Sequence, residues 1–581
     1  MHDIPKNRDA PRIKSAQQRR PKKAERDKYY TIRFYFLIII LLLGFSGLIW
    51  RLIELNIFER SFLKRQSDAR TVRTINIQAN RGMIMDRNSM PLAVSTPVDS
   101  VWVNPQIFAP TAQQLIFISK LLNVSPTVVQ KKLIQKKNSW FIYLKRHVSP
   151  QISDRLKAMN LPGLYLQREY QRYYPEADVT AHVLGFTNID DHGQEGLELA
   201  FDSWLSGEPG KMQVLKDRLG HIVAVINTQS TPKEGRNLIL SIDRRIQYLA
   251  YSELKKAVQK YNAESGSAVV LDAKTGEILA MVNHPSYNPN NRLSGENNKH
   301  RNRAVTDSFE PGSTIKTFSI ASALQSGKYS MNTKIDTNPG RLYVSGNIIK
   351  EDHPVNYGIM SLTQILQKSS NVGTVKVILS LPAENLWTLL HQIGFGERTS
   401  SGFPGEVSGS IIDLHALKTR PFVLATLSFG YAMTITPLQL ASAYATLANN
   451  GAKLPVTFIK LQEPNKAEQV INPKIAHDML IMLRSILAAG GTGTRANVRG
   501  YTIAGKTGTA HVAVNGAYDK KLHVSTFAGI APATNPRLAV VVVVKGSHEQ
   551  YYRGGLVAAP VFASIMEGVL RFMGVPPDDI N

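Results

Sequence analysis

The chain has 581 residues and carries 69 Lys and Arg against 44 Asp and Glu, a formal charge of +25. Its hydrophobic share of 43% and charged share of 19% are ordinary for globular proteins and exclude wholesale disorder. Cysteine is absent, which excludes a disulfide framework, thiolate-bound metal clusters and a cysteine nucleophile. The positive charge leaves three kinds of partner open: nucleic acid, a membrane surface or an acidic polymer.

The N-terminus predicts a basic tail followed by one membrane anchor. Residues 1–33 hold eleven Lys and Arg, four Asp and Glu and few apolar residues, so we expect a disordered tail. Phe34–Trp50 is uncharged, and two more apolar residues after Arg51 extend it to the length of one bilayer crossing. A signal peptide would end in a small-residue cleavage site, which this stretch lacks. The sequence predicts a transmembrane helix over residues 34–53 with the tail in the cytoplasm.

The rest of the chain divides at a polar, breaker-rich segment, Asn227–Gly235. Before it, residues 54–232 mix short strands with helices predicted at Ala112–Leu122 and Pro126–Lys136. After it, residues 233–577 form a second domain with an α/β pattern. Its predicted elements are a helix at Arg244–Tyr261, hairpin strands at Ser267–Asp272 and Glu277–Asn283, and a buried strand at Leu538–Val544.

Ser-x-x-Lys occurs three times, and the copies at Ser61 and Ser252 are expected to be solvated pairs on helix surfaces. The copy at Ser313 follows Glu-Pro-Gly and precedes an apolar helical pattern, which places the serine at a helix N-terminus. Lys316 lies on the same side and could reach the Ser313 hydroxyl. A buried lysine has a lowered pKa and could take the serine proton. The alternative is a capping serine beside an exposed lysine.

Two further motifs complete a catalytic set. Lys506-Thr507-Gly508-Thr509 is predicted to lie on a strand, whereas the Lys-Thr-Gly copy at residues 274–276 fits a hairpin turn. Residues 500–507 also match a phosphate-loop pattern, but the residues that follow are poor helix formers, which argues against nucleotide binding. Ser369-Ser370-Asn371 falls between two helical stripes, so Ser369 and Asn371 could point into a cleft.

The three motifs, in this order, resemble those of class B penicillin-binding proteins, and the cell-division (septal) type most closely. The resemblance implies an α/β (α+β) serine penicillin-recognising transpeptidase fold with an elongated mixed α/β pedestal and a single transmembrane helix. It extends over nearly the whole chain and includes signatures at Arg81–Asn88, Arg168–Pro175, Gly193–Glu198, Gly430–Tyr431, Thr436–Leu440 and Gly554–Pro560.

The resemblance implies a peptidoglycan D,D-transpeptidase in which Ser313 attacks the D-Ala–D-Ala carbonyl after losing its proton to Lys316. Ser369 with Lys506 would pass a proton to the leaving D-alanine, and Asn371 would bond the substrate peptide. The Lys506–Thr509 strand would bind the substrate. In it, the N–H of Thr509 with that of Ser313 would form the oxyanion hole, and the hydroxyls of Thr507 and Thr509 would hold the terminal carboxylate.

The implied partners are stem peptides, as D-Ala–D-Ala donor and amine acceptor, and β-lactams as inhibitors. Membrane lipid, a multi-span membrane glycosyltransferase and other division-complex proteins complete the set. No cofactor, metal or nucleic acid is expected. The implied location is the inner membrane, single-pass, with a periplasmic catalytic domain. Alternatives left open are an elongation-type transpeptidase, a membrane-anchored β-lactamase or penicillin sensor, and a non-enzymatic division scaffold.

Overall fold

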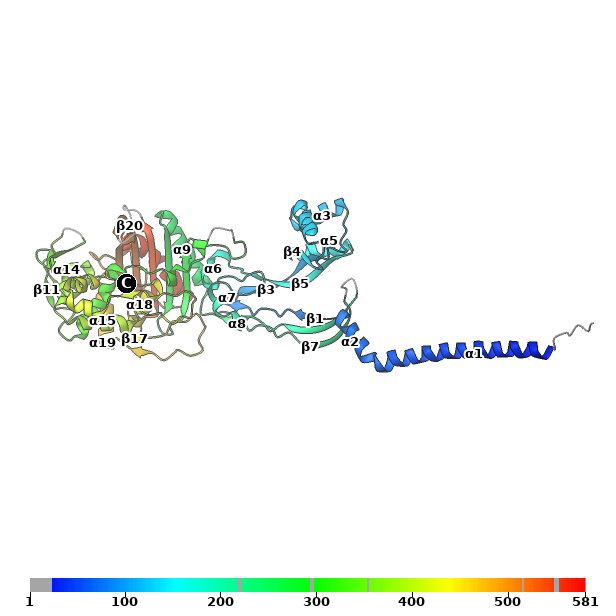
Figure 1. Cartoon of the computed structure of the whole chain (residues 1–581). Coiled ribbons are helices and arrows are strands. Elements are labelled where there is room, and N and C mark those ends of the chain that lie inside the picture. Colours follow the sequence, from blue (N-terminus) through cyan, green and yellow to red (C-terminus); the bar gives the residue numbers. More distant parts are fainter. Residues whose placement is uncertain are drawn as a thin grey trace, which may run out of the picture. The chain divides into compact units, whose positions relative to one another are not determined.

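The computed structural model describes residues 23–217, 222–292, 297–352, 355–514, 517–547 and 553–579. The chain forms two compact units. The first comprises Met1–Asn76 and Lys211–Ser230, and the second Ile77–Gly210 and Thr231–Asn581. Figure 1 labels many of the helices and strands named below.

The first unit contains the membrane anchor. Helix α1 (Lys23–Ile53) runs into a π-helical turn (Glu54–Phe58) and helix α2 (Arg60–Thr71). Residues 29–58 are long and apolar enough to cross a membrane, which confirms the predicted helix. The expectation of disorder is wrong for residues 23–33, which continue the helix because Lys, Ala, Glu and Arg are good helix formers; residues 1–22 lie outside the described part.

A three-stranded sheet in the order β1-β6-β7 completes this unit. Its strands are β1 (Val72–Ile77), β6 (Gly210–Lys216) and β7 (Ile222–Ser230). The breaker-rich segment that we predicted to separate the two domains therefore begins as a strand. Its first residues, Asn227–Ser230, pair with β6 instead of forming a loop.

The second unit begins with a mixed α/β pedestal built around the long strand β3 (Pro91–Val103). Strands β2 (Ile84–Met85), β4 (Ile142–Val148) and β5 (Leu164–Tyr173) pair with β3, and β8 (Leu238–Ile239) pairs with β2. The start of β3 contributes to the main core and its end to a second, smaller core beneath three helices. These helices are α3 (Ala112–Leu122), α4 (Pro126–Gln135) and α5 (Pro150–Ala158), and the first two confirm the predictions.

A buried ion network fastens the pedestal together. The Glu198 carboxylate, fully buried, accepts hydrogen bonds from Arg81 Nε at 2.8 Å and Arg172 Nε at 2.6 Å. One carboxylate thus joins two segments more than 80 residues apart. The short helices beside it are α6 (Ala181–Leu184), α7 (Gly196–Ala200) and α8 (Asp202–Leu205).

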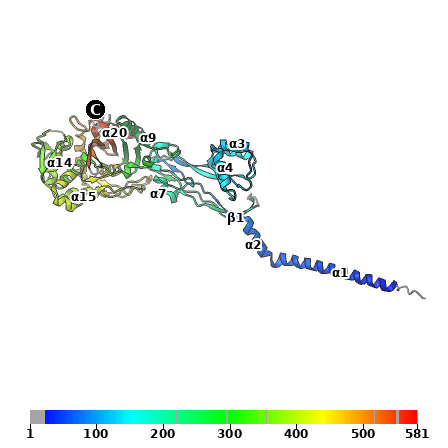
Figure 2. The same ribbon diagram turned by 45° about the horizontal axis from the view of Figure 1, so that its top comes forward.

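The catalytic domain is built on a five-stranded antiparallel sheet in the order β10-β9-β21-β20-β19. Strands β9 and β21 are buried along almost their whole length, because helices cover both faces. Helices α9 and α20 pack against each other (Figure 2) and against the sheet. Helix α18 packs against β9 and β21. The bounds are β9 (Ser265–Asp272), β10 (Ile278–His284), β19 (Ala504–Val514), β20 (Ala517–Ala531), β21 (Leu538–Ser547), α9 (Arg244–Lys260), α18 (Pro437–Ala448) and α20 (Gly554–Phe572).

The predicted helix and strands of this domain are confirmed to within two or three residues at each end. The α20 helix is apolar enough to resemble a membrane span, but half of it is buried in the core. The remaining helices are α10 (Asn297–His300), α11 (Arg303–Thr306), α12 (Lys316–Gln325), α13 (Leu362–Lys368), α14 (Asn371–Leu379), α15 (Ala383–Ile393), α16 (Leu414–Thr419), α17 (Pro421–Leu427) and α19 (Pro473–Arg484). Two-stranded ribbons pair β11 (Lys334–Asp336) with β14 (Ile359–Ser361), β12 (Arg341–Val344) with β13 (Asn347–Lys350), β15 (Ser410–Ile411) with β16 (Met433–Thr434), and β17 (Ala452–Lys453) with β18 (Glu468–Gln469).

Candidate active site

Ser313 lies in a 3₁₀ turn, Gly312–Ile315, that leads into α12. Its side chain is half-buried, and Lys316 opens the α-helix one turn later, as the motif predicts. Gly312 has a φ of +53°, and a Cβ there would lie 2.7 Å from the carbonyl oxygen of Thr509. Only glycine permits this backbone conformation without strain and this close an approach, so Gly312 brings the serine turn against strand β19.

The Ser-x-Asn motif occupies the predicted turn between α13 and α14. Ser369 ends α13 in the left-handed region, with a φ of +60°, and Ser370 caps α14 by accepting a hydrogen bond from the Gly373 N–H. The Ser370 hydroxyl donates to Glu351 Oε1 at 2.5 Å, and the Asn371 N–H donates to Glu351 Oε2 at 2.7 Å. A single buried carboxylate therefore fixes the turn.

Lys316 joins the first motif to the second. Its Nζ, fully buried, donates to the Ser369 carbonyl at 2.6 Å, to Ser369 Oγ at 3.2 Å and to Asn371 Oδ1 at 2.6 Å. Burial lowers the pKa of Lys316 to about 8, although the carboxylates of Glu351 and Asp352 oppose this shift. We predicted that Lys316 could reach the Ser313 hydroxyl, but no hydrogen bond between them is present within the described residues. The amine instead bonds Ser369 and Asn371 of the second motif.

Lys506 lies on β19 and is also fully buried. Burial and, second, the positive charge of Lys316 hold its pKa well below the ordinary value. Its Nζ donates to the Thr507 carbonyl at 3.1 Å and approaches Thr507 Oγ1 at 3.4 Å. Because each lysine charge disfavours the other, the pair favours a state with at least one neutral amine.

The third motif is confirmed as a strand at the edge of the sheet, and its threonines contact a loop and the first residue of α20. Thr507 Oγ1 lies 2.9 Å from Thr492 Oγ1, and Thr509 Oγ1 accepts from the Gly554 N–H at 3.2 Å. A Cβ at Gly508 would lie 2.8 Å from the Pro311 carbonyl oxygen. Strand β19 therefore packs directly on the serine turn.

The structure thus gathers the predicted residues in one place: Lys316 contacts Ser369 and Asn371, and the Ser313 turn contacts the Lys506–Thr509 strand. The motif copies judged to be decoys lie elsewhere, on α2, on α9 and in the β9–β10 turn. The phosphate-loop pattern leads into β19, so the helix that a phosphate loop requires after it is replaced by a strand.

Sequence reasoning missed Glu351 and Thr492, and it used Glu310 only as part of the Glu-Pro-Gly that precedes Ser313. Glu310 precedes the serine turn by two residues and accepts a hydrogen bond from Tyr518 Oη at 3.0 Å. Glu351 follows β13 and lies 18 residues before Ser369, outside any motif, so no local pattern marks it. Within the described residues, no group of three or more His, Asp or Glu side chains could hold a metal ion.

Comparison with known families matches the fold and the site. Residues 266–567 match the family model for the penicillin binding protein transpeptidase domain, which spans more than half of the chain. The chain belongs to this family. Residues 76–240 match a second model, the penicillin-binding protein dimerisation domain, which covers the pedestal described above.

Relatives of the transpeptidase family match the chain over nearly its full length. A probable peptidoglycan D,D-transpeptidase PenA of Neisseria meningitidis is 42% identical over 549 residues, 94% of this chain and 93% of that protein. Peptidoglycan D,D-transpeptidase FtsI of Escherichia coli is 40% identical over 576 residues, covering 98% and 96%.

Solved structures of the family share the fold. A peptidoglycan synthetase from Bifidobacterium adolescentis superposes with a TM-score of 0.70 at 26% identity, covering 88% of this chain and 98% of that one. The transpeptidase domain of penicillin-binding protein 3 from Burkholderia pseudomallei superposes with a TM-score of 0.54 at 37% identity, covering 58% of this chain and 97% of that one.

Proposed function

We propose that the protein is a serine D,D-transpeptidase that cross-links peptidoglycan stem peptides during septal wall synthesis. The observation that carries the proposal is the buried Lys316 amine, with a pKa of about 8, which lies one turn after Ser313 and bonds Ser369 and Asn371. At neutral pH, removal of a proton from a serine hydroxyl requires a nearby base, and a lysine with a pKa of about 8 has a fraction of uncharged amine that can accept the proton.

In the acylation step, Ser313 Oγ attacks the carbonyl carbon of the penultimate D-alanine and gives its proton to Lys316 Nζ. The backbone N–H groups of Ser313 and Thr509 stabilise the developing oxyanion, an effect worth about 3 kcal/mol per donor in other acyl-transfer enzymes. As the C–N bond breaks, Ser369 with Lys506 delivers a proton to the nitrogen of the leaving D-alanine. The 3.2 Å contact of Lys316 Nζ with Ser369 Oγ supports this proton route.

The binding strand orients the donor peptide. The Thr507 and Thr509 hydroxyls, beside the Lys506 amine, would hold the terminal carboxylate, Gly508 would allow close backbone approach, and Asn371 would bond the peptide side. In the second step an amine of a neighbouring stem peptide attacks the Ser313 ester, forms the cross-link and regenerates the serine. A β-lactam acylates Ser313 in the same way, and its ring-opened product stays attached.

A cross-linking assay with donor and acceptor peptides tests the reaction. Ser313→Ala should abolish both cross-link formation and penicillin labelling, whereas survival of both would defeat the proposal and favour a scaffold. A β-lactamase would instead release penicilloate rapidly. Septal enrichment of a fluorescent fusion in dividing cells is expected; a lateral-wall signal without it would favour the elongation-type alternative.

The proposed setting is the inner membrane, with one crossing through α1, a cytoplasmic N-terminus and a periplasmic catalytic domain. The apolar helix and the basic residues before it support this topology. Anionic lipid, a multi-span glycosyltransferase and other division proteins are the proposed partners. Reporter fusions at the two ends of α1 test the topology, and a reporter result with the C-terminal side in the cytoplasm would overturn it.

A further inference from the structure

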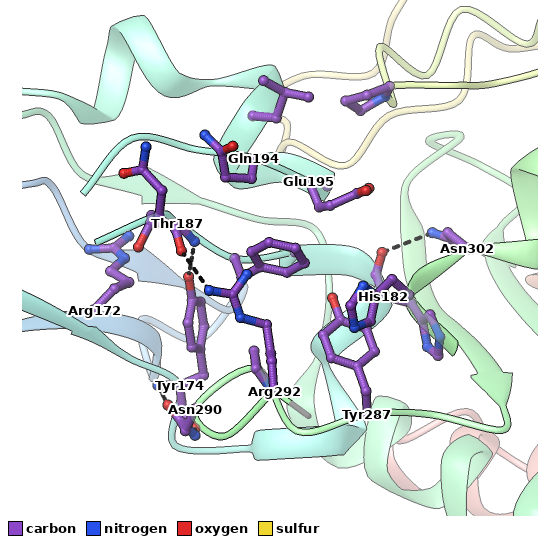
Figure 3. Close-up of a pocket in the computed structure, with 18 of the residues that line it drawn as sticks. Arg172, Tyr174, His182, Thr187, Gln194, Glu195, Tyr287, Asn290, Arg292 and Asn302 are labelled. Atoms are coloured by element: carbon purple, nitrogen blue, oxygen red, sulfur yellow. Dashed lines mark hydrogen bonds between the residues drawn. The ribbon is translucent and has the colours of Figure 1, made fainter. Parts of the chain in front are cut away.

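A cavity of about 1100 Å³ lies between the pedestal and the catalytic domain. Pedestal residues between 170 and 199 form one wall, and the catalytic-domain segments 287–292, 300–306 and 403–405 form the other. None of its lining residues belongs to the three catalytic motifs. We call this space the junction cavity (Figure 3).

Arg292, in the wall of the junction cavity, is held in an orientation that suits binding of a planar anion. The Arg292 guanidinium carbon lies 3.7 Å from the centroid of the Phe186 ring, and Nη2 reaches the Thr187 carbonyl at 3.4 Å (Figure 3). Within the described ranges Arg292 has no acidic partner. Stacking on a ring fixes the plane of a guanidinium and leaves its edge N–H groups for two parallel hydrogen bonds to a carboxylate.

Two residues of the cavity wall have a polar atom without a partner. Arg172 and Asp191 line the cavity, and one atom of each side chain, Arg172 Nη2 and Asp191 Oδ1, is shielded from solvent and makes no hydrogen bond within the described part of the chain. The Arg172 side chain is only 2% exposed, and its Nε is already held by Glu198. Since buried polar groups are nearly always hydrogen-bonded, these two atoms mark a part of the wall whose hydrogen-bonding capacity is unused.

The rest of the lining suits a saccharide. It combines side-chain amides with aromatic rings, which complement the hydroxyl and acetamido groups and the apolar ring faces of a sugar. Gln194 and Glu195 lie on one segment of the wall, and Arg292 reaches toward Thr187 from another (Figure 3). The amides and rings are those of Asn188, Gln194, Asn290, Asn291, Tyr170 and Tyr287.

The junction cavity adjoins a route toward the reactive serine. Arg301 and Thr306 line both this cavity and a smaller one of about 400 Å³. The smaller cavity reaches Glu310, just before the Ser313 turn, and His511 on β19. The two cavities therefore adjoin each other, and tethering of a polymer in the first would raise the effective concentration of its peptides near the Ser313 turn.

We propose that the junction cavity binds a saccharide segment of the peptidoglycan strand in which a muramic acid lacks its stem peptide, with the free lactyl carboxylate of that sugar on Arg292. The inference rests on the proposed function in one respect only, that the ligand is the same polymer whose peptides the serine site joins. It assigns the pedestal a role in binding substrate.

The test uses the full-length protein acylated with penicillin, so that the catalytic cleft is blocked. The probe is the peptide-free disaccharide of N-acetylglucosamine and N-acetylmuramic acid, which carries a free lactyl carboxylate, and binding is measured by calorimetry or ligand-observed NMR. We expect saturable binding that Arg292→Ala weakens at least tenfold and Arg292→Lys weakens less, because lysine keeps the charge without the planar fork. Di-N-acetylchitobiose, which lacks the carboxylate, should bind at least tenfold more weakly.

Arg236→Ala is the matched control, since Arg236 also stacks on a ring, 4.9 Å from the centroid of Trp204, and lies outside the cavity. It should leave binding unchanged, and Arg292→Ala should acylate at the normal rate and keep its melting temperature. Absence of saturable binding, or binding unaffected by Arg292→Ala, would overturn the inference. The titration is repeated without penicillin, so the binding result is decisive even if acylation fails. Failure of acylation would count against the proposed function alone.

Discussion

The carboxylate of Glu351 accepts a 2.5 Å hydrogen bond from the hydroxyl of Ser370, the middle residue of the Ser-x-Asn motif. Its other oxygen accepts from the Asn371 N–H at 2.7 Å. Glu351 has no place in the chemistry proposed above, but it holds the turn that aims Ser369 and Asn371 at Lys316.

Glu351→Ala should slow acylation by at least tenfold. It leaves the Ser370 hydroxyl and the Asn371 N–H without their acceptor in a buried site, at a cost of about 1–3 kcal/mol. Glu351→Gln keeps one acceptor oxygen, so its acylation rate should lie between those of the unmodified protein and Glu351→Ala. The measurement is the second-order rate of labelling by a fluorescent penicillin, with thermal unfolding measured in parallel. A normal labelling rate in Glu351→Ala would show that the carboxylate does not position the turn.

The rate of acylation should depend on the protonation of Lys316. Burial lowers its pKa to about 8, and only the neutral amine can accept the Ser313 proton. Below pH 8 the amine is mostly protonated, so the rate should rise about tenfold per pH unit and level off above about pH 8. A pH–rate profile of penicillin acylation measures this directly. A rate that is flat from pH 6 to 9, or that falls as the pH passes 8, would rule out Lys316 as the proton acceptor.

Gly312→Ala should disrupt the site, because a Cβ at this position would lie 2.7 Å from the Thr509 carbonyl oxygen. Either the serine turn or strand β19 must move, and we expect acylation to fall more than tenfold. Gly327→Ala is the control: this glycine also has a positive φ, +73°, but nothing lies within 4 Å of the added Cβ. It should cost only about 1 kcal/mol of backbone strain and leave acylation unchanged. Equal rates in the two variants would show that the Gly312–Thr509 contact is dispensable.

Much of the site could be predicted because its motifs are local. Ser313 and Lys316 share one turn, and the Thr507–Thr509 strand shows in its β-branched and small residues. What the sequence could not supply were the contacts made by isolated residues distant along the chain. Glu351 belongs to no periodic pattern, and the residue that leaves no room for a Cβ at position 312 is Thr509, almost 200 residues later.

The limits of the elements show the same division between local and distant causes. Amphipathic α9 was predictable from its own periodicity. The helical start of α1 at Lys23 was missed because charge suggested disorder where helix propensity prevails. The strand at Asn227–Ser230 was missed because its stability comes from pairing with β6, which no local composition reveals.

Glu198→Ala should strongly destabilise the pedestal. The Glu198 carboxylate pairs with Arg81 and Arg172, whose side chains are each only 2% exposed. Its loss leaves the buried Arg172 charge without its ion-pair partner and Arg81 with Asp202 alone, at a cost of about 3–5 kcal/mol. Thermal and denaturant unfolding of the soluble part of the protein would record the loss. Glu208→Ala, which breaks an exposed ion pair with Lys233, should leave the melting temperature nearly unchanged. Comparable losses in both variants would contradict the role assigned to the buried network.

The central claim is that Ser313 is the acylated nucleophile. Intact-protein mass spectrometry after incubation with penicillin, followed by peptide mapping, tests it most directly. We predict a single adduct on the peptide that contains Ser313, stable for hours and absent from Ser313→Ala. An adduct on another residue, or rapid release of penicilloate with the free protein regenerated, would contradict the account.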